Sequence, residues 1–163
     1  LLVGMLRPAR GRIAIDNTDI AGLSLFAVGQ RAGYLFQNPA RQLFCASVEE
    51  EIRFGLVNQG WDAARQAEII ARQLSLFRLA HRREAHPQQL SQGEKQRLAL
   101  AAVLALGTRY VILDEPTGGL DMAARRSLGR LLRELRDQGQ GLVLVSHERE
   151  FIRRYVDREL VLA

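Results

Sequence analysis

The sequence predicts an α/β fold built on a parallel sheet. In its second half, strand-like and helical stretches alternate: an apolar run at Tyr110–Leu113, a helix from Asp121, and a second apolar run at Leu142–Val145. Continuously apolar runs are typical of strands buried on both faces of a parallel sheet. The helix from Asp121 carries a stripe on one face, made of Leu128, Leu131, Leu132 and Leu135. This alternation favours a sheet covered by helices on both faces.

Residues 1–45 are predicted to hold only short elements. Apolar Leu2, Met5 and Leu6 predict the end of a helix that stops before Pro8. Arg12–Ile15 alternates like a short strand, and Asp16-Asn17-Thr18-Asp19 is typical of a turn. A further strand is expected at Ala32–Phe36, followed by the loop signal Gln37-Asn38-Pro39.

Residues 46–105 are predicted to be mainly helical. Acidic residues 49–51 crowd the first turn of a helix from Val48, where they suit the helix dipole. Asp62 is the expected N-cap of the next helix, which reaches about Leu76. Pro87 closes this block, and another helix starts at Ser91. After the second apolar run we expect a short helix and a last strand at Glu159–Leu162.

The composition excludes several classes of protein. The chain has 163 residues, 47% of them hydrophobic, which fits one globular domain. The net charge is +5, but the arginines are spread from Arg7 to Arg158 and only 6% of residues are aromatic, so no nucleic-acid partner is expected. Cys45 is alone, which excludes an internal disulfide and favours a reducing compartment. No apolar run approaches the roughly 20 residues that span a bilayer, and no signal peptide is visible.

The segment Leu90-Ser91-Gln92-Gly93-Glu94-Lys95-Gln96-Arg97 opens a helix. Ser91 and Glu94 form the S-x-x-E pattern of a capping box, and a capping box alone would explain Ser91 without any ligand. Gly93 adds a second feature, because glycine has a poor helix propensity yet lies in the first turn. There it would let an anion approach backbone N–H groups that carry partial positive charge.

Two adjacent carboxylates, Asp114 and Glu115, follow the first apolar run. In α/β folds, ligands bind at the carboxyl ends of the strands, so both acids are expected at a site. Two neighbouring carboxylates are costly to bury, and a divalent metal ion removes that objection. The alternative is an exposed strand end, which the following sequence Pro116-Thr117-Gly118-Gly119-Leu120-Asp121 disfavours.

These segments together resemble the nucleotide-binding domain of ATP-binding cassette (ABC) proteins. Residues 90–97 match its L-S-x-G signature, residues 110–117 its Walker B strand and D-E-P-T sequence, and His147 its switch histidine. The resemblance covers essentially all 163 residues. It implies a P-loop NTPase fold of the ABC type, with a parallel-sheet core and a helical subdomain, and an ATPase that uses ATP with Mg²⁺.

The resemblance also implies a role for each site residue. Asp114 matches the Walker B aspartate that holds Mg²⁺, and Glu115 matches the general base that polarises the attacking water. His147 matches the residue that contacts the γ-phosphate, although a lone histidine at a strand end is usually structural. Ser91 and Gly93 would contact the γ-phosphate of an ATP held mainly by the opposite subunit of a dimer.

Gln37 and Asp121 match two further positions. Gln37 corresponds to the Q-loop glutamine, which reaches Mg²⁺ and water and reports the nucleotide state to a membrane partner. By itself, a glutamine before Asn-Pro is an ordinary loop residue. Asp121 corresponds to the D-loop aspartate that couples the two sites of the dimer, and it also suits the N-cap of its own helix.

Three residues differ from the commonest sequences of the family's motifs. Gln92 and Glu94 replace a glycine and a glutamine of the signature, and Glu148 follows His147 where aspartate is frequent. None of these changes removes a reactive group.

The most serious difference from the family is the absence of a phosphate loop in these residues. No G-x-x-x-x-G-K-[S/T] occurs in these residues, since the single lysine, Lys95, follows Glu94. We therefore expect a domain truncated before Leu1, with three parts: a β-subdomain remnant with the Q-loop (residues 1–45), a helical subdomain with the signature (46–105) and a Walker B to switch-histidine core (106–163). We also expect weak ATP binding, no activity by the chain alone, and a gap next to the Walker B strand.

The sequence of residues 36–55 resembles that of the ATPase subunits of energy-coupling-factor importers, which carry cobalt, nickel or vitamins. This implies a peripheral protein at the cytoplasmic face of the membrane, a second nucleotide-binding subunit, and a transmembrane permease that docks near Gln37 to Phe54. Alternatives remain open. They are a soluble ABC ATPase of DNA repair or translation, a non-catalytic module that complements a partner's ATP site, and an inert fragment.

Overall fold

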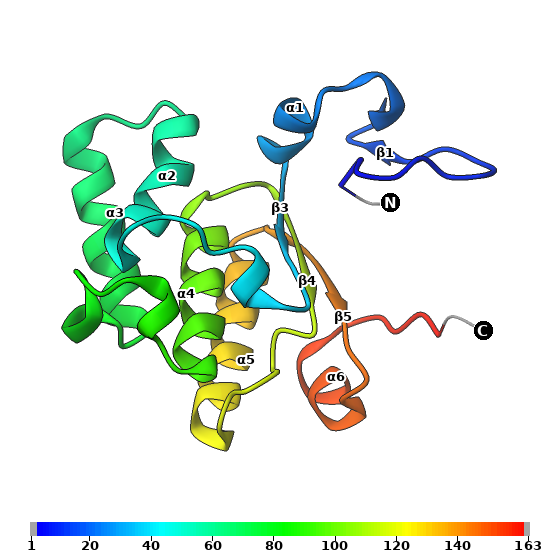
Figure 1. The fold of residues 1–163 in the computed structure, drawn as a ribbon. Helices are drawn as coiled ribbons and strands as arrows, with labels where there is room; N and C mark the ends of the chain where they lie inside the picture. The colour runs from blue at the N-terminus through cyan, green and yellow to red at the C-terminus, as the bar shows by residue number, and fades with distance from the viewer. Residues whose placement is uncertain (1–2, 162–163) are drawn as a thin grey trace.

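The main sheet of the molecule has three parallel strands in the order β3–β4–β5. The computed structural model describes residues 3–161, and these strands are β3 (Ala32–Leu35), β4 (Tyr110–Asp114) and β5 (Gly141–Val145). The central strand β4 pairs with both neighbours, so that Val111 lies opposite Gly33 on one side and Leu142 on the other. The predicted α/β fold with a parallel sheet is confirmed, and its layers can be followed in Figure 1.

Helices of the middle and second half build the core against this sheet. Helix α4 (Gln92–Ala105) lies between the sheet and the pair α2 (Val48–Asn58) and α3 (Ala63–Leu76), as Figure 1 shows. Helix α5 (Met122–Asp137) adds Leu128 and Leu132 to the same core. Gly55 on α2 leaves room for the Leu106 side chain, which lies 2.4 Å from the position that a Cβ would take there. The close approach joins α2 to the end of α4, and α4 in turn packs on the sheet at β3.

Side-chain caps explain where these helices begin. Ser47, Asp62, Ser91 and Asp121 each accept a hydrogen bond from a backbone N–H group in the first turn of their helix. The predicted caps Asp62 and Asp121 are confirmed. Shorter elements fill the connections. They are α1 (Leu25–Gly29), α6 (Arg149–Tyr155) and the 3₁₀ turns Ile20–Gly22, Pro39–Arg41, Ala80–Arg82 and Pro87–Gln89.

The N-terminal region forms a small antiparallel hairpin. Its strands are β1 (Ala14–Ile15) and β2 (Thr18–Asp19), so the predicted four-residue turn is wrong in its second half. Asp16 and Asn17 alone make the turn, both with positive φ, as a two-residue hairpin loop requires. The helix end predicted before Pro8 is also wrong. Residues 3–6 form turns and bends, and Leu1 and Leu2 lie outside the described residues.

The predicted C-terminal strand and the predicted gap need correction as well. Residues 159–161 form no strand, and Leu160 and Val161 are exposed. An apolar stretch becomes a strand only beside a neighbour that pairs with it. Leu162 is outside the described residues. The gap expected next to the strand ending in Asp114 is absent, since β4 is paired on both sides. Among residues 3–161, the two outer strands, β3 and β5, each lack a second neighbour.

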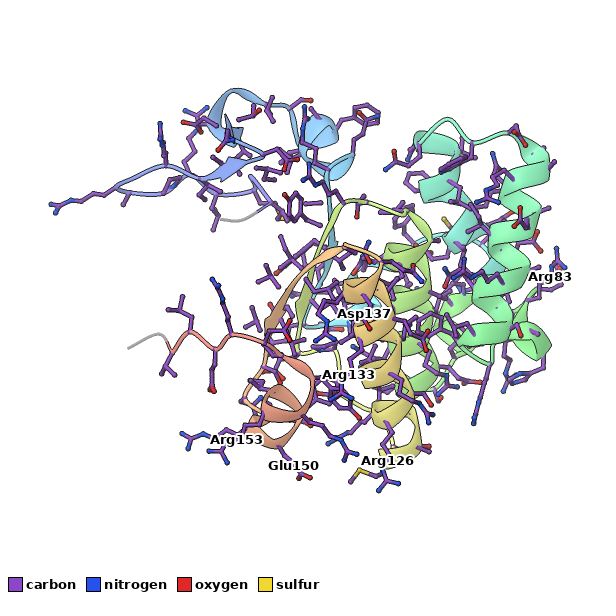
Figure 2. The ribbon with its side chains drawn as sticks, turned by 180° about the vertical axis from the view of Figure 1, so that it is seen from behind. Arg83, Arg126, Arg133, Asp137, Glu150 and Arg153 are labelled. Carbon is purple, nitrogen blue, oxygen red and sulfur yellow. The ribbon has the colours of Figure 1, made fainter. Side chains whose placement is uncertain are left out.

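The arginines of the described residues lie at the surface, as their spread along the sequence predicted. Figure 2 shows Arg83, Arg126 and Arg153 projecting outward from three different parts of the molecule. The buried polar side chains of the described residues include no arginine. No helix in residues 3–161 is both long and apolar enough to cross a membrane.

Candidate functional site

The candidate site lies where β4 and β5 end at the same edge of the sheet. The parallel register pairs Asp114 with Val145, so the residues that follow, Glu115 and Ser146, also lie side by side. The Glu115 N–H donates to the Val145 carbonyl at 2.8 Å, which extends the pairing by one residue. Glu115 has φ +48, a conformation that glycine, asparagine and aspartate adopt far more readily than glutamate. Strained backbone at the end of a strand is a feature of functional sites.

The Glu115 carboxylate is held by the loop after β5. The His147 N–H donates to Oε1 at 3.0 Å, the His147 Nδ1 lies 2.7 Å from the same oxygen, and the Ser146 hydroxyl donates to Oε2 at 3.2 Å. The Glu115 side chain is 18% exposed, whereas that of His147 is 84% exposed. A carboxylate fixed by three contacts beside an open imidazole can orient a water molecule for attack on a bound ligand.

Asp114 is oriented from the neighbouring strand. The Tyr34 hydroxyl on β3 donates to Asp114 Oδ2 at 3.2 Å. Burial, together with the charge of Asp114, raises the pKa of Tyr34 above its ordinary value, so the phenol stays a hydrogen-bond donor. Sequence reasoning did not identify this tyrosine, because its contact with Asp114 joins residues on separate strands.

The donor set at Asp114 fits Mg²⁺ in a nucleotide complex. Such ions take one or two protein carboxylates and complete their shell with water and phosphate oxygens. In residues 3–161, no three His, Cys, Asp or Glu side chains gather as they would around an ion held by protein alone. Asp114, with its second oxygen available beside the Tyr34 contact, is the residue that would hold Mg²⁺, and the ion would neutralise phosphate charge there.

A second set of contacts fixes the loop between β4 and α5. Buried Gln96 of α4 donates through Nε2 to the Pro116 carbonyl at 3.0 Å. Buried Thr117 donates to Glu148 Oε1 at 3.0 Å, and Arg125 Nη1 donates to Glu148 Oε2 at 2.9 Å. Glu148 directly follows His147, so these bonds connect the loop after β5 to the loop between β4 and α5 and to the start of α5. The sequence had singled out Glu148 only as a departure and assigned no role to Gln96, Thr117 or Arg125.

The start of α4 packs against this same loop. The predicted capping box is present: the Ser91 N–H donates to Glu94 Oε2 at 2.8 Å, and the Glu94 N–H donates to the Ser91 hydroxyl at 3.3 Å. Hydrogen bonds from the Ser91 backbone and side chain lower the pKa of Glu94 to about 2. A Cβ on Gly93 would lie 3.0 Å from the Gly119 carbonyl. Close backbone packing is therefore a second reason for glycine at this position.

The predicted site residues fall into two groups. Asp114, Glu115 and His147 come together at the edge of the sheet, and Gln37 is exposed two residues beyond β3, at the carboxyl end of the neighbouring strand. Ser91, Gly93 and Asp121 lie at the starts of α4 and α5. In the described part of the chain, no hydrogen bond joins the second group directly to Glu115 or His147. The contacts through Gln96 and Gly119 are the link between them.

Comparison with known proteins places the chain in a family. The sequence profile of the family described as ABC transporter matches residues 1–118. A putative ABC transporter ATP-binding protein of Methanosarcina acetivorans is 40% identical over 161 residues, which is 99% of this chain and 26% of that protein. The energy-coupling factor transporter ATP-binding protein EcfA1 of Thermotoga maritima is 38% identical over 152 residues, which is 93% of this chain and 57% of that protein.

Solved structures agree with the sequence comparison. The structure of cbiO1 from Clostridium perfringens, described as part of the ABC transporter complex cbiONQ, has a TM-score of 0.78 and 31% identity, and the match covers 96% of this chain and 63% of that one. The ATP-binding cassette MJ0796 bound to ADP and Pi has the same fold, with a TM-score of 0.85. This chain spans about a quarter of the M. acetivorans relative and just over half of EcfA1. The chain belongs to the ABC transporter family and has the fold of its ATPase domain.

Proposed function

We propose that this chain is the ATP-hydrolysing part of a nucleotide-binding subunit that powers import across a membrane. The observation that carries the proposal is the Glu115 carboxylate, which three contacts from the β5 loop hold in place beside Asp114 and an exposed His147. The family match and the EcfA1 relative support the same function.

Hydrolysis would proceed by in-line attack of water on the γ-phosphate of ATP. Glu115 polarises the water, and its fixed position limits the orientations that the water can take. His147 projects from the protein surface beside this carboxylate and would contact the γ-phosphate through Nε2, the ring nitrogen that does not face Glu115. Asp114 would hold Mg²⁺, and Gln37, which follows β3, would reach the ion and the water. Ser91 and Gly93 contact the phosphate tail of an ATP held by a second nucleotide-binding subunit, and Asp121 couples the two sites of the dimer.

An apolar groove supports docking of the transmembrane permease near Gln37 to Phe54. A cavity of about 290 Å³ is lined by Phe44, Phe54 and Leu106 among others, and the rings of Phe44 and Phe54 meet edge to face at 4.9 Å. Both phenylalanines are largely exposed. Buried Glu51 fixes this wall, since its Oε2 accepts the N–H groups of Phe44 at 2.9 Å and Cys45 at 2.8 Å. A short permease helix with apolar side chains would fit here, at the cytoplasmic face of the membrane.

We further infer that three consecutive parts of the chain have different roles. Residues 1–45 bring the Q-loop, 46–105 the helical subdomain with the signature, and 106–163 the core with the acids and the histidine. Residues 1–163 contain no G-K-[S/T] sequence, and we propose that they do not turn over ATP by themselves.

The test is Mg²⁺-dependent ATP hydrolysis by this chain joined at its start to a segment that carries a G-x-x-x-x-G-K-[S/T] phosphate loop. We expect turnover that Asp114→Asn reduces by about 100-fold or more, since the carboxylate on the ion is lost. Turnover that is unchanged in this variant would contradict the role of Asp114. Docking is tested separately: Phe44→Ala with Phe54→Ala should abolish co-purification with a membrane permease and leave ATP hydrolysis intact. Co-sedimentation with ribosomes instead would contradict a transport function.

A further inference from the structure

A second cavity lies at the opposite edge of the sheet from the candidate site. It has a volume of about 440 Å³ and is bounded by α3, by the loop that leads into β4, and by the end of α5 with the turn that leads into β5. Because residues 107–109 precede β4 and residues 138–140 precede β5, the cavity opens at the amino ends of these strands. Pockets of roughly 300–1,000 Å³ are typical of sites for small molecules.

Gln73 lines this cavity with an amide group that the protein leaves unsatisfied. Its side chain belongs to the buried face of α3 and is only 7% exposed, yet its Oε1 has no hydrogen-bond partner among the described residues. Gln140 repeats the feature on the other wall: its Nε2 donates to the Thr108 carbonyl at 2.5 Å, and its Oε1 is unpaired. Buried polar groups are nearly always hydrogen-bonded. Both oxygens are shielded from solvent, so a donor in the cavity would reach either of them only after that side chain rotates.

Both basic and apolar side chains line the cavity. Arg65, Arg72 and Arg109 line it. Arg65 pairs with Glu68 at 2.6 Å and Arg109 with Asp16 at 3.0 Å, whereas Arg72 makes no ion pair within residues 3–161. Side chains of Ile69, Leu104 and Leu131 supply the apolar surface. An unpaired guanidinium beside apolar surface suits a carboxylate or phosphate group attached to an apolar body.

We propose that this cavity binds a small amphipathic anion: a molecule with a carboxylate or phosphate group, an apolar body and an N–H or O–H donor. The anion pairs with Arg72, the apolar body lies on Ile69 and Leu104, and the donor satisfies an amide oxygen of Gln73 or Gln140 after a small side-chain adjustment. The site is separate from the residues assigned to ATP and does not depend on their function.

The test uses the whole 163-residue chain and two probes, N-acetyl-leucine and phenyl phosphate, titrated while backbone NMR spectra are recorded. We expect saturable shifts confined to residues 65–76, 104–109 and 138–140 with at least one probe. The probe that binds identifies the preferred anion. N-acetyl-leucinamide, which keeps the body and the donor without the charge, should bind more weakly than N-acetyl-leucine if the carboxylate is preferred.

Matched variants distinguish a specific binding site from the general attraction of anions to a basic surface. Arg72→Gln should weaken binding by roughly tenfold, since one charge-assisted pair is lost. Arg126→Gln removes the same charge from the exposed part of α5 that Figure 2 shows, outside the cavity, and should leave binding unchanged. Gln73→Leu should raise the melting temperature and weaken binding, because it replaces an unsatisfied amide. No saturable shift with either probe, or equal weakening by Arg72→Gln and Arg126→Gln, would overturn the proposal.

Discussion

Strands β4 and β5 lie side by side and have similar five-residue sequences, yet only one of them is buried. Val111, Ile112 and Leu113 of β4 are each at most 5% exposed, whereas Val143 and Val145 of β5 are 42% and 49% exposed. The difference arises from neighbours, because β4 pairs on both sides and β5 pairs on one side among the described residues. Apolar sequence therefore predicts that a strand forms, and its neighbours decide how deeply it is buried.

The two halves of the candidate site inherit this difference. Asp114 and Glu115 follow the buried strand, and Ser146 and His147 follow the exposed one. The contacts of Glu115 with the β5 loop join the half that follows the buried strand to the half that follows the exposed strand. Whether the site keeps its shape thus depends on how firmly β5 is held.

The largest expected effect comes from matched valine substitutions. Val111→Ala on β4 should lower the free energy of unfolding by about 2–3 kcal/mol, because two methyl groups leave a fully packed position. Val143→Ala on β5 should cost less than about 1 kcal/mol, since that side chain is already 42% exposed. Urea denaturation of both variants is the measurement. Equal losses would mean that β5 is covered in solution, and the comparison would fail.

Hydrogen exchange sharpens the comparison residue by residue. The Gly141 N–H donates to the Arg109 carbonyl, and N–H groups alternate in direction along a strand, so those of Leu142 and Leu144 point away from β4. We expect these two amides to exchange on the order of 100-fold faster than that of Val143. Amide-resolved exchange by NMR is the check. Slow exchange at Leu142 and Leu144 would show that another strand pairs with this edge.

A smaller effect concerns the helix that supports β4. Ser91→Ala should lower the free energy of unfolding by about 1 kcal/mol through loss of the cap. The pKa of Glu94 should rise from about 2 but stay below 4.5, because the hydrogen bond from the backbone N–H of residue 91 remains. A lowered pKa stabilises the fold fully above about pH 4.5 and loses this contribution as the pH falls toward 2. A carboxyl titration by NMR in both proteins tests the shift, and an unchanged pKa would contradict it.

The smallest effect on stability should come from His147. Its side chain is 84% exposed, so His147→Ala should change the free energy of unfolding by less than about 1 kcal/mol despite the short contact with Glu115. Thermal unfolding measures this. A large loss would mean that the histidine supports the fold, as lone histidines at strand ends often do.

Local signals in the sequence predicted most of the fold. The strands of the main sheet and the caps Asp62, Ser91 and Asp121 were predicted because apolar runs and capping residues act within a few positions. The last strand failed because Leu160 and Val161 have no strand to pair with in the described chain, and pairing is not local.

The candidate site was predicted in part for the same reason. Asp114, Glu115 and His147 were recognised from motifs, and their meeting follows from the parallel register. The contacts of Glu148 with Thr117 and Arg125 join positions 31 and 23 residues apart, and the contact of Tyr34 with Asp114 spans 80. No pattern within a single segment indicates such contacts.

The central claim is that Glu115, held between the ends of β4 and β5, activates water for attack on ATP. The direct measurement is the Mg²⁺-ATP turnover rate of Glu115→Gln, made in the chain joined to a phosphate loop. We predict a loss of at least about 100-fold, with ATP-dependent dimers still formed, because the amide keeps the shape of the side chain and cannot accept the proton. Turnover at the rate of the unsubstituted protein would contradict the claim.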